Sequence, residues 1–304
     1  MRSLGRQAGK IHAEGRKLRR NSSTIGALAV ALVSALAVFA CDEDVRPGSG
    51  QGSGGGEGPS ACTRQALSSA LDAYFTALAA HDPSKLSLAS GVKYTEKGAQ
   101  VPVGQGLWQT AGAVKFTRRA IDAKTCNVVA QAVLPKSGRD IVYGVRLKLA
   151  GGQISEIETI PVEPGDYFGG TSPSGLLSTR GDDWETPIPA ADRMSRDEMT
   201  LVLDRYFKLF PGGACNFADT CERRENGASF GNCSFLLSCS NRDPAAVSSA
   251  MAPRLHVLDE EAGIAVGFVM WTGQYADFHM FKLRGRKVAA VHAVLAQAAQ
   301  SGWD

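Results

Sequence analysis

The chain has almost no net charge of either sign and no apolar run long enough to cross a membrane. It holds 33 Lys and Arg against 30 Asp and Glu in 304 residues. Residues 1–40 contain seven of the cations and one of the acids, so the remaining 264 residues carry a net charge of −3. Phosphate binding needs a cationic face, and a nucleic-acid partner is therefore not expected. A hydrophobic content of 44% with 21% charged residues excludes a disordered or fibrous chain.

An apolar run of 16 residues, 25–40, follows the basic segment Arg16–Arg20. A spanning helix needs about 20 residues, whereas the apolar core of a signal peptide is shorter. Val38-Phe39-Ala40-Cys41 resembles a bacterial lipobox, although leucine is usual where Val38 stands. Ordinary signal-peptidase cleavage before Cys41 is the alternative, and both interpretations predict export. We expect residues 1–40 to be a signal peptide with a lipobox, and lipidated Cys41 to anchor the protein to a lipid bilayer of the bacterial cell envelope.

The next segment, residues 41–60, is acidic and then rich in Gly and Ser. Such a composition cannot bury a core and is typical of a flexible tether. The remaining length predicts two domains.

Six cysteines follow Cys41, and an even number in an exported chain predicts disulfides. They are Cys62, Cys126, Cys215, Cys221, Cys233 and Cys239. The last four have the spacing C-x5-C-x11-C-x5-C, which fits zinc poorly because zinc ligands favour C-x2-4-C pairs. Four cysteines allow three pairings, which the sequence leaves open, and Cys62 with Cys126 is the other candidate bridge. We expect neither a metal nor a cofactor.

The chain also repeats itself at an interval of about 130 residues, a self-similarity that predicts tandem copies of one domain. Three segments recur in the same order: Leu71-Asp72-Ala73-Tyr74-Phe75 as Leu203-Asp204-Arg205-Tyr206-Phe207, Glu96-Lys97-Gly98 as Glu225-Asn226-Gly227, and Leu147-Lys148-Leu149 as Phe281-Lys282-Leu283. We expect one copy at 61–163 and a second at 191–304, joined by a Pro- and Gly-rich linker at 164–190. An insertion in the second copy falls in a Cys-rich loop, 215–239.

Each copy begins with an amphipathic helix and continues with strands. Leu67, Leu71, Tyr74 and Leu78 have helical spacing, and that helix should stop at Asp82-Pro83. Apolar and β-branched runs then predict strands at 92–96, 127–134, 141–149 and 154–160, and at 255–258, 264–271, 276–283 and 288–295. The order predicts an α+β fold in which a helix packs on one face of an antiparallel sheet.

Several motifs point to a known family. They are Tyr94-Thr95-Glu96-Lys97-Gly98, Gly104-Gln105-Gly106-Leu107-Trp108 and Cys221-Glu222-Arg223-Arg224-Glu225-Asn226-Gly227. The chain from about residue 62 to 304 resembles the nuclear transport factor 2-like superfamily, also called SnoaL-like or cystatin-like cones. More narrowly, it is similar to a group of exported bacterial and fungal proteins of unassigned function with tandem cones. Lys97 replaces the Asn of that pattern, and His292 stands where a Glu is expected in the last strand.

The resemblance implies two cone-like domains, each a curved sheet wrapped around a helix with an apolar cavity. It also implies that the domains face each other as an internal pseudo-dimer. The superfamily contains isomerases, dehydratases and epoxide hydrolases, and also binding and dimerisation modules. Its enzymes use a buried carboxylate or histidine as general base.

Four residues are candidate general bases. Glu158 and His292 occupy equivalent positions in the last strand of each copy, and the alternative is that they are solvated or structurally paired. Glu96 and Glu225 precede Gly98 and Gly227, where the alternative is a plain hairpin turn. The candidate pocket residues are Trp108, Tyr94, Arg146, Arg223, Trp271 and His279. Asp122 and Asp259 are expected to be turn residues at strand starts.

The leading functional hypothesis is an exported lipoprotein that binds a small apolar ligand or acts as an accessory module. The alternative is a cofactor-independent lyase, isomerase or hydrolase that uses one of these bases. Gly227-Ala228-Ser229-Phe230-Gly231 matches the nucleophile motif G-x-S-x-G, but it lies in a polar Cys-rich stretch and lacks the strand–turn–helix context that this motif needs.

Overall fold

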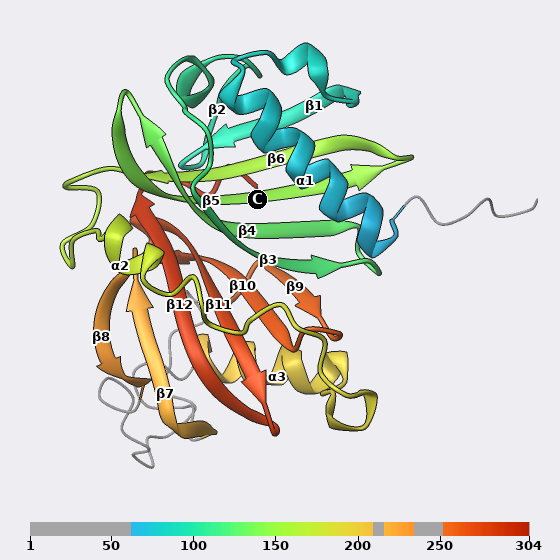
Figure 1. Cartoon of the computed structure of the whole chain (residues 1–304), viewed down its shortest axis with the longest axis vertical. Helices are drawn as coiled ribbons and strands as arrows, with labels where there is room; N and C mark the ends of the chain where they lie inside the picture. Colours follow the sequence, from blue (N-terminus) through green and yellow to red (C-terminus); the bar gives the residue numbers. More distant parts are fainter. Residues whose placement is uncertain (1–61, 209–215, 234–251, 304) are drawn as a thin grey trace, which may run out of the picture. The chain divides into compact units, whose positions relative to one another are not determined.

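The computed structural model describes residues 62–208, 216–233 and 252–303 (Figure 1). The predicted signal peptide and tether, with Cys41, lie outside the described residues, as do Cys215 and Cys239. The first copy comprises α1 (Arg64–Ala79), β1 (Leu88–Glu96), β2 (Ala99–Gln100), β3 (Phe116–Asp122), β4 (Asn127–Lys136), β5 (Arg139–Ala150) and β6 (Gln153–Val162). The second comprises α3 (Arg196–Lys208), β7 (Phe217–Glu225), β8 (Ala228–Asn232), β9 (Leu255–Asp259), β10 (Ile264–Trp271), β11 (Tyr275–Arg284) and β12 (Lys287–Gln297). A short helix, α2 (Pro173–Leu177), lies between them in the chain.

Both sheets have the same strand order, β2-β1-β6-β5-β4-β3 and β8-β7-β12-β11-β10-β9. The α+β fold class and the duplication are therefore confirmed. The sheets are mixed and not wholly antiparallel, because β1 runs parallel to β6 and β7 runs parallel to β12. A hairpin forces its two strands to be antiparallel, but β1 and β6 are joined through the whole rest of the sheet, so either direction is open to them.

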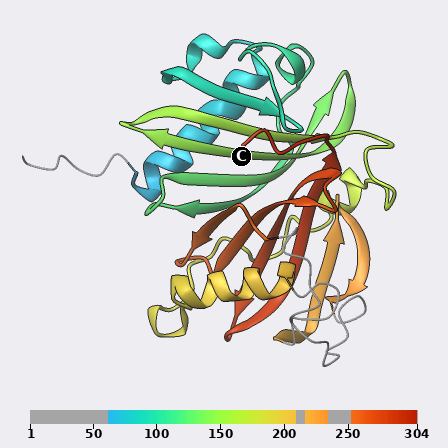
Figure 2. The same ribbon diagram turned by 180° about the vertical axis from the view of Figure 1, so that it is seen from behind.

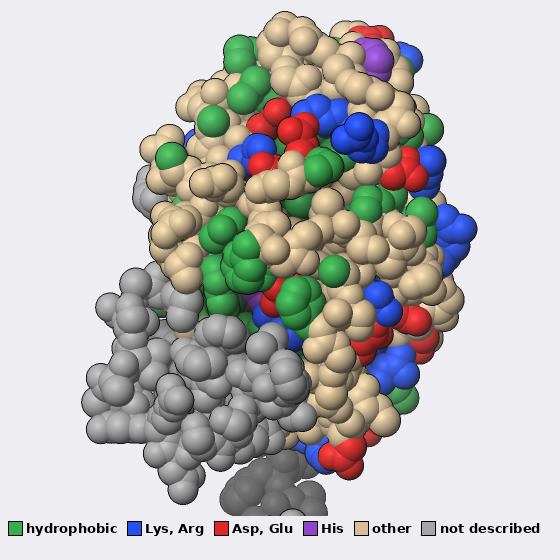
Figure 3. Space-filling view, turned by 90° about the vertical axis from the view of Figure 1, so that its left-hand side faces the viewer, with side chains coloured by type: hydrophobic (Ala, Val, Ile, Leu, Met, Phe, Trp, Pro, Cys, Tyr) green, Lys and Arg blue, Asp and Glu red, His purple; other side chains and the backbone are tan. Residues whose placement is uncertain are grey.

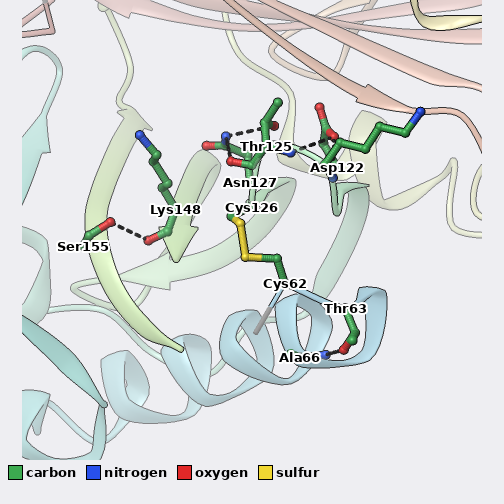
Figure 4. The surroundings of a disulfide bond; sticks show 10 residues. Cys62, Thr63, Ala66, Asp122, Thr125, Cys126, Asn127, Lys148 and Ser155 are labelled. Atoms are coloured by element: carbon green, nitrogen blue, oxygen red, sulfur yellow. Dashed lines mark hydrogen bonds between the residues drawn. A yellow bond between two sulfur atoms is a disulfide. The ribbon is translucent and has the colours of Figure 1, made fainter. Parts of the chain in front are cut away.

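Helix α1 covers one face of the first sheet, and α3 covers one face of the second (Figures 1 and 2). The predicted apolar stripe of α1 is buried: Leu67, Leu71, Tyr74 and Leu78 are at most 1% exposed. Thr63 caps the helix by accepting a hydrogen bond from the Ala66 amide. The predicted Cys62–Cys126 disulfide is present and fastens the start of α1 to the turn between β3 and β4 (Figure 4).

The Cys-rich segment is not only a loop, as the sequence suggested, because it contains β7 and β8. A second disulfide, Cys221–Cys233, joins these strands. The sequence of β7 does not show the pattern of a strand, because charged residues occupy two of its inward-facing positions. These are Arg223 and Glu225, which are 1% and 5% exposed. Period-two patterning identifies a strand only where the buried face is apolar.

The faces of the two sheets that α1 and α3 leave open contribute to one apolar core. It includes Val129, Val133, Val142 and Ile160 from the first copy and Val266, Phe268, Phe278 and Val294 from the second. At Gly144 the packing is so close that a Cβ atom would lie 2.4 Å from the ring of Phe278.

Two reciprocal ion pairs link the copies near the starts of their helices. Arg64 donates to both carboxylate oxygens of Asp259, at 2.8 and 3.0 Å, and Arg196 donates to both of Asp122, at 3.0 and 2.7 Å. Asp122 and Asp259 are turn residues, as expected, because Asp122 accepts from the Lys124 and Thr125 amides and Asp259 from the Ala262 amide, but the prediction that they stand at strand starts is wrong. They end β3 and β9, are 1% exposed, and each also accepts a backbone amide of the other copy, Leu258 and Ile121 respectively.

Candidate functional site

The polar interior of the second copy lies between its sheet and α3. Asp277, His279 and Phe281 follow one another at a spacing of two along β11 and so share a face, which packs against Tyr206 of α3. The Tyr206 and Phe281 rings are 4.8 Å apart. Asp277 and His279 are both 1% exposed.

One end of this interior is a fully paired network around Glu225. Arg223 Nε donates to Glu225 Oε1 at 3.1 Å, and a further guanidinium nitrogen donates to the hydroxyl of Tyr206. The hydroxyl of Tyr167, from the segment that joins the copies, donates to Glu225 Oε2. Burial raises the pKa of Tyr206 to about 12, although Arg223 opposes the shift. The network holds one cation and one carboxylate in fixed positions inside the fold.

At the other end of the interior, the polar groups of Asp277 and His279 lack good hydrogen bonds. Nδ1 of His279 lies 3.2 Å from Oδ1 of Asp277, within ion-pair distance. Among the described residues, however, neither oxygen of Asp277 and neither ring nitrogen of His279 has a partner in hydrogen-bonding geometry. Burial raises the pKa of Asp277 above its usual range, and the neighbouring His279 only partly offsets this.

Aromatic rings surround His279. Trp271 and Phe281 stack on it, with ring centres at 5.7 and 6.2 Å, and Phe207 meets it edge-on at 5.1 Å. Apolar walls around an acid and a base are the setting in which proteins shift pKa values for proton transfer.

The first copy has different side chains at the equivalent positions. The sheet registers, in which Glu158 corresponds to His292, place Tyr143 where the second copy has Asp277, and Val145 where it has His279. Tyr94 likewise replaces Arg223. This interior is filled by Tyr74, Tyr94, Trp108 and Tyr143, all 0% exposed.

Polar groups in the first copy are largely paired. The hydroxyls of Tyr74 and Tyr143 are 2.6 Å apart, and Glu96 accepts from the Tyr94 hydroxyl and from the Leu107 amide, the latter at 2.6 Å. The indole Nε1 of Trp108 has no partner among the described residues. The duplication has therefore given one copy a tyrosine-rich core and the other a charged one.

The remaining predicted bases lie elsewhere. Glu158 is on the sheet face opposite α1, where Arg146 Nε donates to it at 3.0 Å and Arg254 of the second copy pairs with it. His292 also lies between the copies: Nη1 of Arg118 is 2.7 Å from its Nδ1, and the ring of Trp184 is 4.8 Å away. Burial, reinforced by Arg118, lowers the pKa of His292 well below its usual value.

Placing Glu158 and His292 in a cone interior is therefore wrong, and so is assigning Arg146 to a pocket. Alternation along the strand correctly placed Glu158 with Ile160, but it could not say that their face meets the other copy. Of the predicted residues, the structure brings together Glu225, Arg223, Trp271 and His279 in the second interior, and Glu96, Tyr94 and Trp108 in the first. Sequence analysis missed Asp277 and Tyr167 as site residues. The acid in the apolar strand Ala276–Leu283 was a usable signal for Asp277, whereas nothing marked Tyr167.

The fold and the site together define a tandem α+β protein in which each copy packs a helix on a six-stranded sheet, and the second copy has a charged interior where the resemblance implied an apolar cavity. A family described as "Domain of unknown function (DUF8021)" matches residues 60–161 and 192–295, and the chain belongs to this family. No curated protein matches the chain.

Solved structures similar to this chain each match about a third of it. An LEH-like epoxide hydrolase from M. tuberculosis is 17% identical, over 32% of this chain and 84% of its own, with a TM-score of 0.26. An NTF2-like protein of unknown function from Cytophaga hutchinsonii is 10% identical, over 32% and 89%, with a TM-score of 0.26. A de novo designed protein with a curved β-sheet is 14% identical, over 33% and 88%, with a TM-score of 0.29.

Proposed function

We propose that the second copy binds a small apolar molecule and that Asp277 and His279 move a proton to or from it. The observation that carries the proposal is that Asp277 and His279 are buried with their nearest polar atoms 3.2 Å apart, and that none of their four polar atoms has a partner in hydrogen-bonding geometry among the described residues. An unpaired buried polar group costs about 1–3 kcal/mol, so native proteins rarely keep several together without a ligand or a chemical role.

The chemistry follows from the surroundings. Asp277, whose pKa is raised, can remain protonated and donate a hydrogen bond to a substrate oxygen, while His279 accepts a proton. Arg223 supplies a fixed positive charge at the other end of the interior, where Glu225 and Tyr206 hold it. Trp271, Phe207 and Phe281 exclude water, which strengthens each electrostatic contact.

A non-catalytic binding protein is the second candidate. The low exposure of Asp277 and His279, both 1%, favours this candidate. A ligand enters and leaves so buried a site slowly, which a binding protein tolerates better than an enzyme that must release product in every cycle. In that case the two side chains would only hydrogen-bond a polar group of the ligand.

The test uses 5-nitrobenzisoxazole, an apolar heterocycle whose ring opens when a base removes one proton. We expect the wild type to accelerate the opening, and Asp277→Asn and His279→Phe each to lower the rate about 100-fold, the usual contribution of general acid–base catalysis. The control, Tyr143→Phe, changes the equivalent position of the first copy and should keep the wild-type rate.

Equal rates in all four proteins would refute proton transfer. The binding candidate would survive that result only if the probe bound saturably to the wild type and Asp277→Asn abolished the binding.

Two further proposals concern location and assembly. The disulfides in the described part of the chain indicate an oxidising compartment, and no helix there is long and apolar enough to cross a membrane. We propose that lipidated Cys41 anchors the protein to a bacterial envelope membrane through the tether at 41–60. If so, Cys41→Ala releases the protein from the membrane fraction, and continued retention would contradict the anchor. We also propose that the copies form an internal pseudo-dimer, which the reciprocal Arg64–Asp259 and Arg196–Asp122 pairs support.

A further inference from the structure

The segment that joins the two copies runs past the second interior and is held at both ends. We define residues 163–172, between β6 and α2, as the strap. Near one end, Asp166 accepts from Nζ of Lys97 at 3.1 and 3.2 Å, and its carbonyl accepts from the Gln297 amide at 3.0 Å. At the other end, the Ser172 amide donates to the carbonyl of Asn226 at 2.8 Å. The strap thus connects a turn of the first copy to β12 and to the β7–β8 turn of the second (Figure 1).

Tyr167 is the strap residue that enters the second copy. Its side chain is 8% exposed, its ring meets Tyr275 edge-on at 5.7 Å, and its hydroxyl donates to Glu225 Oε2. Because Arg223 occupies Oε1, Tyr167 takes the other oxygen of the same carboxylate. The next residue, Phe168, points outward and is 82% exposed.

The position of Tyr167 relates it to the unpaired acid and base. Tyr275, Asp277 and His279 succeed one another on one face of β11, so a ring packed on Tyr275 covers the approach to Asp277 from that end. Ala293 and Leu295 of β12 complete the small apolar cluster on which Tyr167 rests. Figure 3 shows hydrophobic side chains grouped on this side of the molecule, with acidic and basic side chains next to them.

Glycines with positive φ angles stand on both sides of Tyr167 in the strap. Gly165 and Gly170, which flank Tyr167, have φ angles of 93° and 78°, in the region that glycine adopts at little cost. Gly169 lies against the ring of Tyr167, where a Cβ atom would be 2.4 Å from it.

We propose that the strap is the cover of the second-copy site, that Tyr167 is the positioning residue that closes it and orients Glu225, and that Lys97 of the first copy holds the strap down. The inference rests on the site proposed above. It gives the first copy a role, because its β1–β2 turn supplies the ion pair that secures the cover. It also accounts for a lysine at position 97, since an asparagine would be too short and uncharged to pair with Asp166.

The test measures how fast diethylpyrocarbonate modifies individual histidines at pH 7.5, by peptide mass spectrometry. His279 reports on the covered site, and His292, which is 0% exposed between the copies, reports on opening of the fold as a whole. We expect Tyr167→Phe to raise the His279 rate about fivefold, because it loses one hydrogen bond while keeping the ring. Tyr167→Ala, which also loses the ring, should raise it further.

Lys97→Met should also raise the His279 rate about fivefold, the effect of losing one charged contact on local opening. The matched control is Lys115→Met, which removes the surface pair with Asp140 in the same copy and should leave His279 unchanged. The His292 rate should stay the same in all variants.

Unchanged His279 rates in the Tyr167 variants would overturn the strap proposal. A parallel rise at His292 would overturn it too, because Tyr167 would then only stabilise the fold. A wild type that protects His279 through the strap but does not open 5-nitrobenzisoxazole would refute the proposed chemistry and leave the strap intact.

Discussion

Asp277 and Asp122 are both buried aspartates at 1% exposure, yet they have opposite electrostatic roles. Arg196 and a backbone amide outweigh the burial of Asp122 and hold its pKa below the usual range, whereas burial dominates at Asp277 and raises its pKa. The sequence could not assign these roles, because it shows Asp122 only as an acid beside a turn and Asp277 only as an acid within an apolar strand. What distinguishes a structural carboxylate from one available for chemistry is whether the other copy supplies partners for it.

Asp277→Asn should make the fold more stable at neutral pH. The folded state of the wild type binds a proton at Asp277 more tightly than the unfolded chain does, so its stability falls as pH rises from about 4 through the raised pKa of Asp277. We expect the variant to lose that part of the pH dependence and to be more stable above it by about 1–3 kcal/mol, because a neutral amide avoids the desolvation cost of a buried carboxylate. Urea unfolding from pH 4 to 9 measures this, and a variant less stable than the wild type at every pH would contradict it.

The elements were predicted well where one face is apolar. The continuous apolar runs of β4, β5, β10 and β11 and the apolar stripe of α1 follow directly from side chains that must leave water. β3 and β7 were missed because they carry charged residues at buried positions, Arg118 in β3 and Arg223 and Glu225 in β7. β8 was missed because it is partly exposed throughout, and β2 because it is only two residues long. The apolar pattern of these strands does not show which face meets the helix and which meets the other sheet, because both faces are buried.

Gly144→Ala should destabilise the protein through the contact between sheets. The added Cβ would lie 2.4 Å from the ring of Phe278 and 3.1 Å from Val294, in a core where neither can move aside. Overpacking of this kind costs about 1–3 kcal/mol, measurable as a lower Tm. Gly181→Ala is the control, because nothing lies within 4 Å of its added atom. Equal effects of the two changes would show that the contact between sheets is not tight.

At the scale of the whole molecule, the duplication allowed the copies to diverge. Sheet contacts and two reciprocal ion pairs link them, so one interior could become a tyrosine-rich core while the other kept charged groups. Ion pairs with a buried carboxylate can specify an arrangement more than they stabilise it, and we expect these two to favour one placement of the sheets against each other.

Arg196→Met should weaken the dependence of the protein's stability on pH in the acidic range. The folded pKa of Asp122 lies below its unfolded value, so its contribution to stability is present above about pH 4 and is lost as pH falls through the folded pKa. We expect a loss of about 1–3 kcal/mol at pH 7 that narrows on acidification. Arg284→Met, which breaks an exposed pair with Asp183, is the control and should cost about 0–1 kcal/mol. A difference between Arg196→Met and the wild type that stays constant from pH 7 to 2 would refute this role.

The sequence alone predicted the duplication and the α+β class, and it named Cys62–Cys126 as a candidate bridge and Glu225, Arg223 and His279 as candidate site residues. These depend on local patterns and on the repeat, which one-dimensional information contains. Only the tertiary structure decided that Glu158 pairs with Arg254 and His292 with Arg118 across the copies, that Asp277 is buried beside His279, and that Tyr167 enters from the linker. Each of these depends on contacts between residues far apart in the chain. The small net charge with which the sequence began gave no sign of the pairs that link the copies, Arg64 with Asp259 and Arg196 with Asp122, because net charge does not depend on where the charges lie.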